Sequence, residues 1–374
     1  MKIELTRIDT EDMEGRCYVH ARGLITESGF GMITMQQLDI TGIDLFHGIE
    51  MMTTRDGGES FSSPKVCENL KLRHLPDSTA EVMCDATPFY HKKTGKILLV
   101  GLTTTYRDNA ITKSPKRRST AYAVYDYEKN DFEQWKSVEM PESDEYFISG
   151  CGCGQILELN DGDLLIPIYH CTYENAINPL NLHAYTSIMR CGFDGERIWI
   201  KEIGNSITVA EPRGLLEPSI ARFGDEYLVA LRNDITGYVA KSADGVHLGE
   251  PVELKFDDGE NAGNYNTQQH WIVGDGKLWL VYTRRAENNS HVFRHRAPLF
   301  VAEFDPKAMC LKRNTEKIAV PERGARLGNF GCQSYSARQG FVFASEWMQG
   351  DEGPDGCRKY GSDNSIFVSR LIFE

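Results

Sequence analysis

The sequence predicts an all-β fold, a six-bladed β-propeller, from a repeat and from the absence of helical patterning. Six segments share one pattern: an apolar run, a polar turn with glycine, and a second apolar run. They are residues 23–35, 88–102, 155–169, 219–232, 270–284 and 334–347. Their turn glycines, at positions 31, 95, 162, 224, 276 and 340, are 64, 67, 62, 52 and 64 residues apart. That spacing suits a four-stranded blade with long loops, since known blades have about 40–50 residues.

Each repeated segment is typical of a β-hairpin. In residues 270–284, HWIVGDGKLWLVYTR, two apolar runs flank a Gly-Asp-Gly turn, where glycine accepts a positive φ. No apolar stripe with a 3.6-residue period extends beyond three helical turns. Six such units fill residues 1–374 as a single domain, and radial repetition protects the sheet edges. A pair of β-sandwiches or a large barrel is the alternative.

Composition excludes several classes of protein. The 374 residues carry a net charge of −13, with 41% hydrophobic and 25% charged residues, as in a soluble globular protein. No apolar run approaches the roughly 18 residues of a membrane span, and the N-terminal residues lack a signal peptide's apolar region. We therefore expect a cytoplasmic protein without a membrane partner. The negative charge also argues against nucleic-acid binding, which requires neutralisation of phosphates.

The ten cysteines predict buried, reduced thiols. Cys151 and Cys153 lack the two-residue spacer of zinc and thioredoxin-type sites. No paired-histidine zinc motif, P-loop or dinucleotide fingerprint is present. We therefore expect no metal site and no cofactor.

Residues 54–61, TRDGGESF, have the S/T-x-D-x-G-x-x-W/F form of an Asp-box. In such a turn the aspartate accepts backbone N–H groups, the glycine adopts a left-handed conformation and the aromatic residue packs between strands. Residues 242–245, SADG, are a degenerate second copy. Both are expected to be structural and serve as markers of the fold.

Over most of its length the chain resembles the sialidase (neuraminidase) superfamily of six-bladed propellers. Residues 152–169 are similar to the family's G-x-G-x-x-L…DG-x-L-x-x-P-x-Y strand pair. Glu217-Pro218-Ser219, followed by Leu231-Arg232-Asn233, is similar to its E-P-S…R-N blade. Residues 296–299, RAPL, look like its later arginine element, and residues 334–336, SYS, look like the segment that carries a tyrosine nucleophile.

The resemblance implies a set of roles. In such enzymes three arginines bind the substrate carboxylate, a tyrosine assisted by a glutamate attacks the anomeric carbon, and an aspartate on an early loop is the acid/base. The matching positions are Arg232 and Arg296 for two arginines, Tyr335 for the nucleophile, Glu217 for its partner, and Asp44 for the acid/base, with Asp39 as the fallback.

The first blade departs from the family pattern. Sialidases carry an R-I-P motif there, whereas this chain has residues 19–24, VHARGL. Either Arg22 supplies the third guanidinium from a shifted position, or His20 replaces it and takes part in catalysis. The departure makes a uronate-type sugar as plausible a substrate as sialic acid.

Elementary chemistry supports an arginine-rich cleft independently of the family. Guanidinium groups bind carboxylates bidentately and keep their charge. A tyrosine needs a neighbouring carboxylate to become a nucleophile, because its ordinary pKa is about 10. Arg107, His91 and His270 lie beside strand ends and are candidates for substrate contact, with a surface ion pair or a hydrogen-bonded loop residue as the alternatives. Arg213, Arg294 and the glycine-rich segment 321–330 are further candidates for the cleft.

Three functions remain open. The first is a retaining exo-glycosidase that hydrolyses a terminal anionic sugar from a small glycan. The second is a propeller polysaccharide lyase acting on a uronate, in which an arginine neutralises the carboxylate and a histidine or tyrosine removes a proton. The third is a propeller that binds carbohydrate without catalysis. All three take a carbohydrate ligand, and none fixes an oligomeric state.

Overall fold

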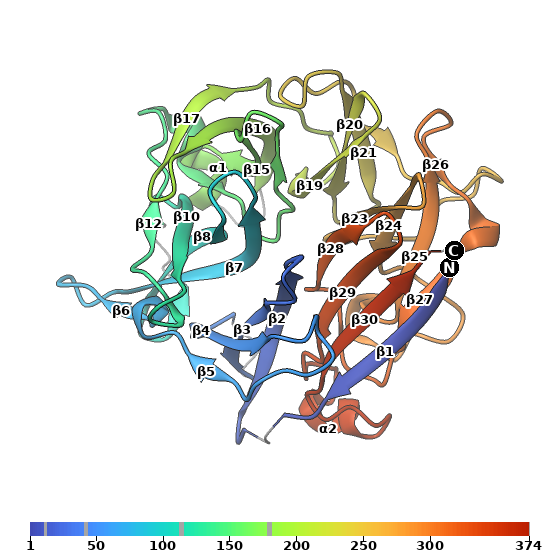
Figure 1. Cartoon of the computed structure of the whole chain (residues 1–374), viewed down its shortest axis with the longest axis horizontal. Helices are drawn as coiled ribbons and strands as arrows, with labels where there is room; N and C mark the ends of the chain where they lie inside the picture. The colour runs from blue at the N-terminus through green and yellow to red at the C-terminus, as the bar shows by residue number, and fades with distance from the viewer. Residues whose placement is uncertain (11–12, 41–43, 112–115, 178–181, 374) are drawn as a thin grey trace.

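The computed structural model of the chain describes residues 1–10, 13–40, 44–111, 116–177 and 182–373, and its strands form a ring of sheets (Figure 1). Hydrogen bonding groups these strands into six sheets. The only α-helices in the described ranges are the short α1 (Tyr173–Ile177) and α2 (Gly353–Arg358). The expectation of an all-β, propeller-like fold is confirmed.

The first three sheets run from the N-terminal part of the chain to its middle. The first contains β2 (Arg16–Ile25), β3 (Gly31–Asp39), β4 (Phe46–Thr54) and β5 (Lys65–Val66). The second contains β6 (Arg73–His74), β7 (Ala80–His91), β8 (Lys96–Arg107), β9 (Ala110–Ile111), β10 (Thr120–Asp126), β11 (Asp131–Phe132) and β12 (Lys136–Ser137). The third contains β13 (Ile148–Gly150), β14 (Leu157–Glu158), β15 (Leu164–Cys171), β16 (His183–Phe193), β17 (Ile198–Ile203) and β18 (Arg213–Gly214).

The remaining three sheets complete the ring. The fourth contains β19 (Leu216–Phe223), β20 (Glu226–Arg232), β21 (Tyr238–Ser242) and β22 (Val252–Glu253). The fifth contains β23 (His270–Gly274), β24 (Lys277–Tyr282), β25 (Leu299–Asp305), β26 (Cys310–Leu311) and β27 (Lys317–Val320). The sixth contains β28 (Gly331–Ser336), β29 (Gln339–Ser345), β30 (Ile366–Ile372) and β1 (Lys2–Ile8). Short 3-10 helices occupy Glu68–Leu70, Asp144–Tyr146, Phe293–His295 and Arg313–Thr315.

All six expected hairpins are present, one in each sheet. They are β2–β3, β7–β8, β14–β15, β19–β20, β23–β24 and β28–β29. The turn glycines at 95, 162, 224 and 276 adopt positive φ, as expected. Two assignments are wrong: Gly31 is the first residue of β3 and Gly29 makes that turn with φ 83°, while Gly340 lies inside β29.

The hydrophobic core is divided among the spaces between neighbouring sheets. Leu98, Ile166 and Met189 pack together between the second and third sheets, and Val281, Val342 and Phe367 pack between the fifth and sixth. Comparable clusters lie between every other consecutive pair, including the sixth and the first. Burial of apolar side chains at each junction therefore holds the ring closed.

Two aspartate turns make the expected local hydrogen bonds. The Asp56 carboxylate accepts from the backbone N–H of Glu59 and Ser60 and from the Ser60 hydroxyl. The Asp244 carboxylate accepts from the N–H of Val246 and His247. These bonds lower the pKa of both carboxyls.

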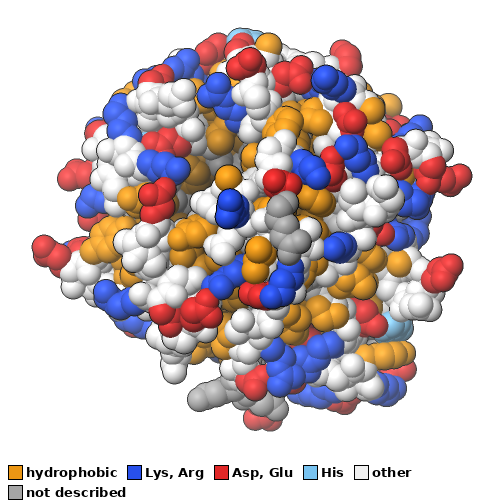
Figure 2. All heavy atoms as spheres, turned by 45° about the vertical axis from the view of Figure 1, so that its right-hand side comes forward, with side chains coloured by type: hydrophobic (Ala, Val, Ile, Leu, Met, Phe, Trp, Pro, Cys, Tyr) orange, Lys and Arg blue, Asp and Glu red, His pale blue; other side chains and the backbone are white. Residues whose placement is uncertain are grey.

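The ten cysteines are free thiols, and eight of them are buried. Burial raises the pKa of most of these thiols, for example that of Cys17 to about 12. Among the described residues no helix has both the length and the apolar character needed to cross a bilayer. Lys and Arg side chains are interspersed with Asp and Glu over the face in Figure 2.

The ends of the chain meet in the sixth sheet (Figure 1). β1 pairs antiparallel with β30, from Lys2 opposite Ile372 to Ile8 opposite Ile366. The first strand of the chain thus forms the outer edge of the last sheet. This pairing joins the two ends of the chain by hydrogen bonds.

Deleting residues 1–8 should lower the free energy of unfolding by at least about 3 kcal/mol, because each lost backbone hydrogen bond contributes about 0.5–1.5 kcal/mol. Urea denaturation followed by circular dichroism measures the change. Replacing Lys2 and Glu4, which form an exposed ion pair, by alanine is the control and should have almost no effect. An unchanged midpoint for the deletion would show that β1 does not stabilise the ring.

Candidate functional site

Three inner strands carry a β-bulge near the same end of the ring. The register shifts between Val19 and Arg22 in β2, between Cys84 and Thr87 in β7, and between Leu216 and Ser219 in β19. Such bulges are common beside active sites, where they re-aim a side chain.

Each of these bulges contains one residue with a left-handed backbone: His20 (φ 59°), Asp85 (φ 54°) and Glu217 (φ 46°). A non-glycine residue in this conformation costs of order 1–3 kcal/mol, and such strain clusters at functional sites. All three side chains line a single cleft of about 300 Å³.

The cleft is rich in charged side chains. Six arginines line it: Arg118, Arg213, Arg232, Arg294, Arg296 and Arg326. Three carboxylates accompany them: Asp44, Asp85 and Glu217. A chain with net charge −13 therefore places an excess of positive charge in this cleft.

Arg232 lies at the end of β20 and is tied to Glu217. Its Nη1 donates to Glu217 Oε1 at 2.5 Å, and its Nη2 donates to Asn266 Oδ1 at 2.9 Å. Burial opposes the charged form of this guanidinium, but Glu217 and Asp234 outweigh burial and raise its pKa. The pair fixes Arg232 in one orientation.

The charge of Arg296 is less well compensated than that of Arg232. Its Nη2 donates to the backbone carbonyl and the side-chain oxygen of Asn266. Burial, followed by the neighbouring Arg232, lowers the pKa of Arg296 to about 9. An anion beside Arg296 would relieve that repulsion.

Arg326 is the least compensated of the three buried cleft arginines. Only 4% of its surface is exposed, and its guanidinium lies 3.2 Å from the centroid of the Trp347 ring, also facing Phe293. In the described part of the chain its guanidinium makes no hydrogen bond or salt bridge. Burial and the nearby Arg296 lower its pKa well below the usual value.

The buried arginines share one feature. The Nε–H groups of Arg232, Arg296 and Arg326 are all buried without a hydrogen-bond partner in the described residues. Buried donors are normally satisfied, and a planar carboxylate matches the guanidinium fork. These Nε–H groups are inaccessible, but the excess of arginines that line the cleft suits it to an anion, most simply a carboxylate.

His20 is enclosed in the wall of the cleft. Its Nε2 accepts from Asn329 Nδ2 at 3.1 Å, and its Nδ1 lies 3.3 Å from Asp85 Oδ1. Burial, with the charges of Arg22 and Arg326, lowers its pKa well below the ordinary value. Nδ1 makes no hydrogen bond to the described residues, and the lowered pKa makes His20 a weak base, so the geometry does not favour the direct catalytic role expected for it.

Asp85 has a buried environment of its own. The Cys153 thiol donates to Asp85 Oδ1 at 3.1 Å. Burial raises the pKa of this carboxyl, while the charge of Arg22 opposes the rise. Asp85 is thus a second cleft carboxyl beside Glu217, with a greater tendency to hold a proton than an exposed aspartate.

Arg22 lies beneath the cleft and does not line it. Its Nε donates to Phe330 O, its Nη1 to Ala86 O, and its Nη2 to Cys153 Sγ and Gln268 Oε1, at 3.0–3.2 Å. None of its surface is exposed. The expectation that Arg22 contacts the substrate is therefore corrected: its guanidinium is already used to join five segments of the chain.

The structure places Tyr335, the expected nucleophile, outside the cleft. It lines a different cavity, together with residues such as Leu24 and Ile220, and packs edge-on against Phe341. Asn329 lines the cleft just before β28 begins, whereas Tyr335 lies near the end of that strand. At about 3.3 Å per residue the two positions are some 20 Å apart along the chain.

The tyrosine that lines the cleft is Tyr169, on β15. It ends the D-G…P-x-Y strand pair, to which the sequence assigned no catalytic role. Burial and the charges of Asp85 and Glu217 raise its pKa well above the usual value. Tyr169 is therefore protonated at neutral pH and lies among carboxylates able to accept its proton.

Three other expected contact residues are outside the cleft. Arg107 is exposed and donates to the Asp77 carbonyl. His91 is buried between Thr94 and the Gly162 carbonyl. His270 bonds Ser219 Oγ through Nδ1, and burial lowers its pKa to about 3. None of the three lines the cleft, and the Nε2 atom of His270 is buried without a hydrogen-bond partner among the described residues.

Asp44 and Asp39, the two candidates for the acid/base, differ in their position relative to the cleft. Asp44 is exposed and lines the cleft. The fallback, Asp39, bonds Arg16 and His47 at the end of β3 and does not line the cleft. No group of three or more His, Cys, Asp or Glu side chains suited to a metal ion exists among the described residues.

Sequence reasoning missed Asp85, Arg118 and Tyr169 as cleft residues. The sequence around Asp85 carried a usable signal, because this acidic residue is followed closely by a proline, Pro88. Glu217 is likewise followed by Pro218. Arg118 is the last residue of a short basic run, 116–118, KRR, that carries no directional information. Arg213, Arg294 and Arg326 were candidates and do line the cleft.

Comparison with solved structures supports the fold assignment. The chain is similar to a Dyadobacter fermentans protein of unknown function (12% identity, 99% of each chain covered, TM-score 0.66). It is also similar to NanB sialidase from Streptococcus pneumoniae (10% identity, 95% of this chain and 68% of that one, TM-score 0.64) and to Trypanosoma rangeli sialidase (11% identity, 98% and 60%, TM-score 0.60).

These likenesses show a shared fold with sialidases. The chain spans only 60% of the Trypanosoma rangeli sialidase chain with which it was compared. No protein-family model and no curated protein matches the sequence.

Replacing Arg22 by methionine should lower the free energy of unfolding by about 3–5 kcal/mol, because it breaks a buried polar network and leaves Asp85 without its nearby positive charge. Denaturant titration measures the loss. Part of the loss should be recovered in Arg22→Met combined with Asp85→Asn, which removes the uncompensated carboxylate. A loss below about 1 kcal/mol for the single variant would contradict the structural role of Arg22.

Proposed function

We propose that the chain is a sialidase-like glycosidase that removes a terminal, carboxylate-bearing sugar from a small glycan. The observation that carries this proposal is the excess of six arginines over three carboxylates in one cleft, where Arg326 has no carboxylate partner among the described residues. In this interpretation the six sheets are six blades, and the Asp56 and Asp244 turns are Asp-boxes.

Arg326 takes the place of the arginine missing from the first blade. Arg232, Arg296 and Arg326 hold the sugar carboxylate, and Trp347 keeps the Arg326 guanidinium in position by stacking. Arg326 comes from the glycine-rich segment 321–330, far in sequence from the motif that it replaces. The carboxylate supplies the negative charge that Arg296 and Arg326 lack within the protein.

The catalytic steps are assigned by position in the cleft. Asp44, exposed at the cleft, protonates the leaving oxygen. The Tyr169 hydroxyl oxygen attacks the anomeric carbon while Glu217 takes its proton, and Asp85 is the second carboxyl available for this transfer. Water activated by Asp44 then cleaves the glycosyl-tyrosine, which gives retention of configuration. A neutral nucleophile suits an anionic sugar, and sialidases are an exception to the usual pair of carboxylates.

A lyase acting on a uronate is the second candidate, favoured by the location of Tyr169 in an arginine cleft. The guanidinium groups would neutralise the sugar carboxylate, and Tyr169 would pass its own proton to Glu217 and then remove the C5 proton. Asp44 would protonate the departing oxygen as the C4–O bond breaks, which leaves a C4–C5 double bond. His20 is a weaker choice of base in this version, because burial and the charges of Arg22 and Arg326 lower its pKa.

Incubation with sialylated and uronate-containing oligosaccharides separates the two reactions. The hydrolase releases a new reducing end without ultraviolet absorbance from a double bond. Ultraviolet absorbance that grows with cleavage would contradict the hydrolase proposal and support the lyase. Binding of these sugars without cleavage would leave a carbohydrate-binding propeller and would overturn both enzymatic proposals.

Tyr169→Phe should lower kcat by about 10²–10⁴, the range expected when a positioned proton-transfer or nucleophilic group is removed. Tyr335→Phe is the matched control and should keep kcat within about twofold, because Tyr335 lines another cavity. The assay is initial rate against substrate concentration with circular dichroism of each variant. Loss of activity in Tyr335→Phe with full activity in Tyr169→Phe would reverse the assignment.

Arg326→Met should raise KM for the anionic sugar by about 10–100-fold, since a hydrogen bond to a charged group contributes about 1.5–3 kcal/mol. Methionine can still lie against Trp347. Arg107→Met removes a positive charge outside the cleft and is expected to leave KM unchanged. Equal effects of the two substitutions would indicate a general electrostatic influence and no specific site.

A further inference from the structure

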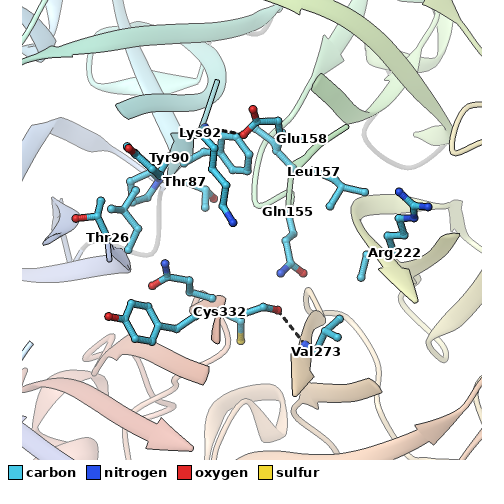
Figure 3. Close-up of a pocket in the computed structure, with 18 of the residues that line it drawn as sticks. Thr26, Thr87, Tyr90, Lys92, Gln155, Leu157, Glu158, Arg222, Val273 and Cys332 are labelled. Atoms are coloured by element: carbon cyan, nitrogen blue, oxygen red, sulfur yellow. Dashed lines mark hydrogen bonds between the residues drawn. The ribbon is translucent and has the colours of Figure 1, made fainter. Parts of the chain in front are cut away.

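A second cavity, of about 770 Å³, lies at the opposite end of the inner strands from the arginine cleft. Along β2, His20 lines the cleft and Gly23–Ile25 line the second cavity. β19 has the same arrangement: Glu217 lines the cleft and Ile220 lines the second cavity. Figure 3 shows the side chains around this space, which come from several sheets of the ring.

The layer around Arg22 separates the two spaces. Arg22, Cys153, Gln268 and Phe330 are joined by hydrogen bonds in the middle of the ring, and none of them lines either cavity. A ligand in the second cavity therefore makes no contact with the arginine cleft.

The inner strand edges at this cavity are already paired by side chains. Gln155 accepts from Trp271 N and donates to Trp271 O, and Gln333 does the same with the backbone of Ile25. Ser334 Oγ accepts from Val273 N. An added β-strand would find these backbone groups occupied, so the cavity suits a small ligand and does not suit an extended peptide.

Lys92 supplies an exposed positive charge. Its side chain extends toward the middle of the cavity, near Gln155 (Figure 3). The adjacent carboxylate, Glu158, accepts from the backbone N–H groups of Lys92 and Lys93, and the ammonium of Lys92 has no carboxylate or carbonyl partner among the described residues. Lys93, in contrast, donates its ammonium to the Asp161 carbonyl at 2.5 Å.

The remaining walls define the ligand further. Leu157, Ile220 and Val273 give an apolar side, and the Tyr335 hydroxyl has no partner among the described residues. Two carboxylates, Glu27 and Glu158, and two further cations, Lys93 and Arg222, also line the cavity. With Lys92 these charged side chains sum to one positive charge, which favours a monoanion over a dianion such as phosphate. A singly charged ligand with C–H faces and hydroxyl groups matches this combination, and the volume is within the usual range for small-molecule sites.

We propose that the second cavity is a binding site for a monoanionic saccharide, with Lys92 bonded to its carboxylate and Tyr335 bonded to a hydroxyl group. This proposal goes beyond the catalytic function and does not depend on it. It also gives Tyr335 a role in sugar binding at a place remote from the cleft.

The test uses Arg326→Met as the background, so that binding in the cleft is weakened. Isothermal titration with D-glucuronate should show one remaining site in this variant. Adding Lys92→Met should weaken that site at least tenfold, whereas adding Lys96→Met, which removes a nearby lysine that does not line the cavity, should leave it intact. Neutral D-glucose and inorganic phosphate should bind at least tenfold more weakly than glucuronate.

Undiminished glucuronate binding after Lys92→Met would overturn the proposal, as would equal losses from Lys92→Met and Lys96→Met. Tight phosphate binding would replace the saccharide by a simple anion site. Failure of the catalytic proposal has a different signature, because it leaves this titration unchanged and appears only as absent cleavage or as an unchanged KM in Arg326→Met.

Discussion

The structure depends on one buried guanidinium in the middle of the ring. Arg22 belongs to β2 and donates to segments next to four other inner strands, at Ala86, Cys153, Gln268 and Phe330. Gly331 permits this approach, because an added Cβ there would lie 2.8 Å from the Arg22 Cβ. The apolar clusters hold neighbouring sheets together, whereas Arg22 connects sheets that are not neighbours.

This network also determines the chemistry above it. The charge of Arg22 partly compensates the buried Asp85, and it helps to keep His20 neutral. The three bulges that carry His20, Asp85 and Glu217 require a rigid support, since each holds a residue in a strained conformation. A central layer fixed by hydrogen bonds provides that support and also closes the ring between the two cavities.

Sequence periodicity was sufficient to predict the hairpins and the ring, because alternating apolar runs and turn glycines are local signals. The same patterns located Arg232, Arg296 and Glu217, which lie at fixed distances from recognisable hairpins. The assignment of Tyr335 to the cleft was wrong, because a two-residue motif fixes neither the strand register nor the end of the strand at which a side chain lies. The expectation that Arg22 contacts the substrate was wrong for a different reason. Its hydrogen-bond partners are residues 86, 153, 268 and 330, and no local sequence pattern shows that these residues converge.

The direct test of the account is a crystal structure of the protein with N-acetylneuraminate or D-glucuronate bound. We expect the sugar carboxylate within about 2.7–2.9 Å of guanidinium nitrogens of Arg232, Arg296 and Arg326. We also expect that Arg22 keeps its four hydrogen bonds. A carboxylate bound elsewhere, or an Arg22 side chain turned into the cleft to reach the sugar, would contradict the account.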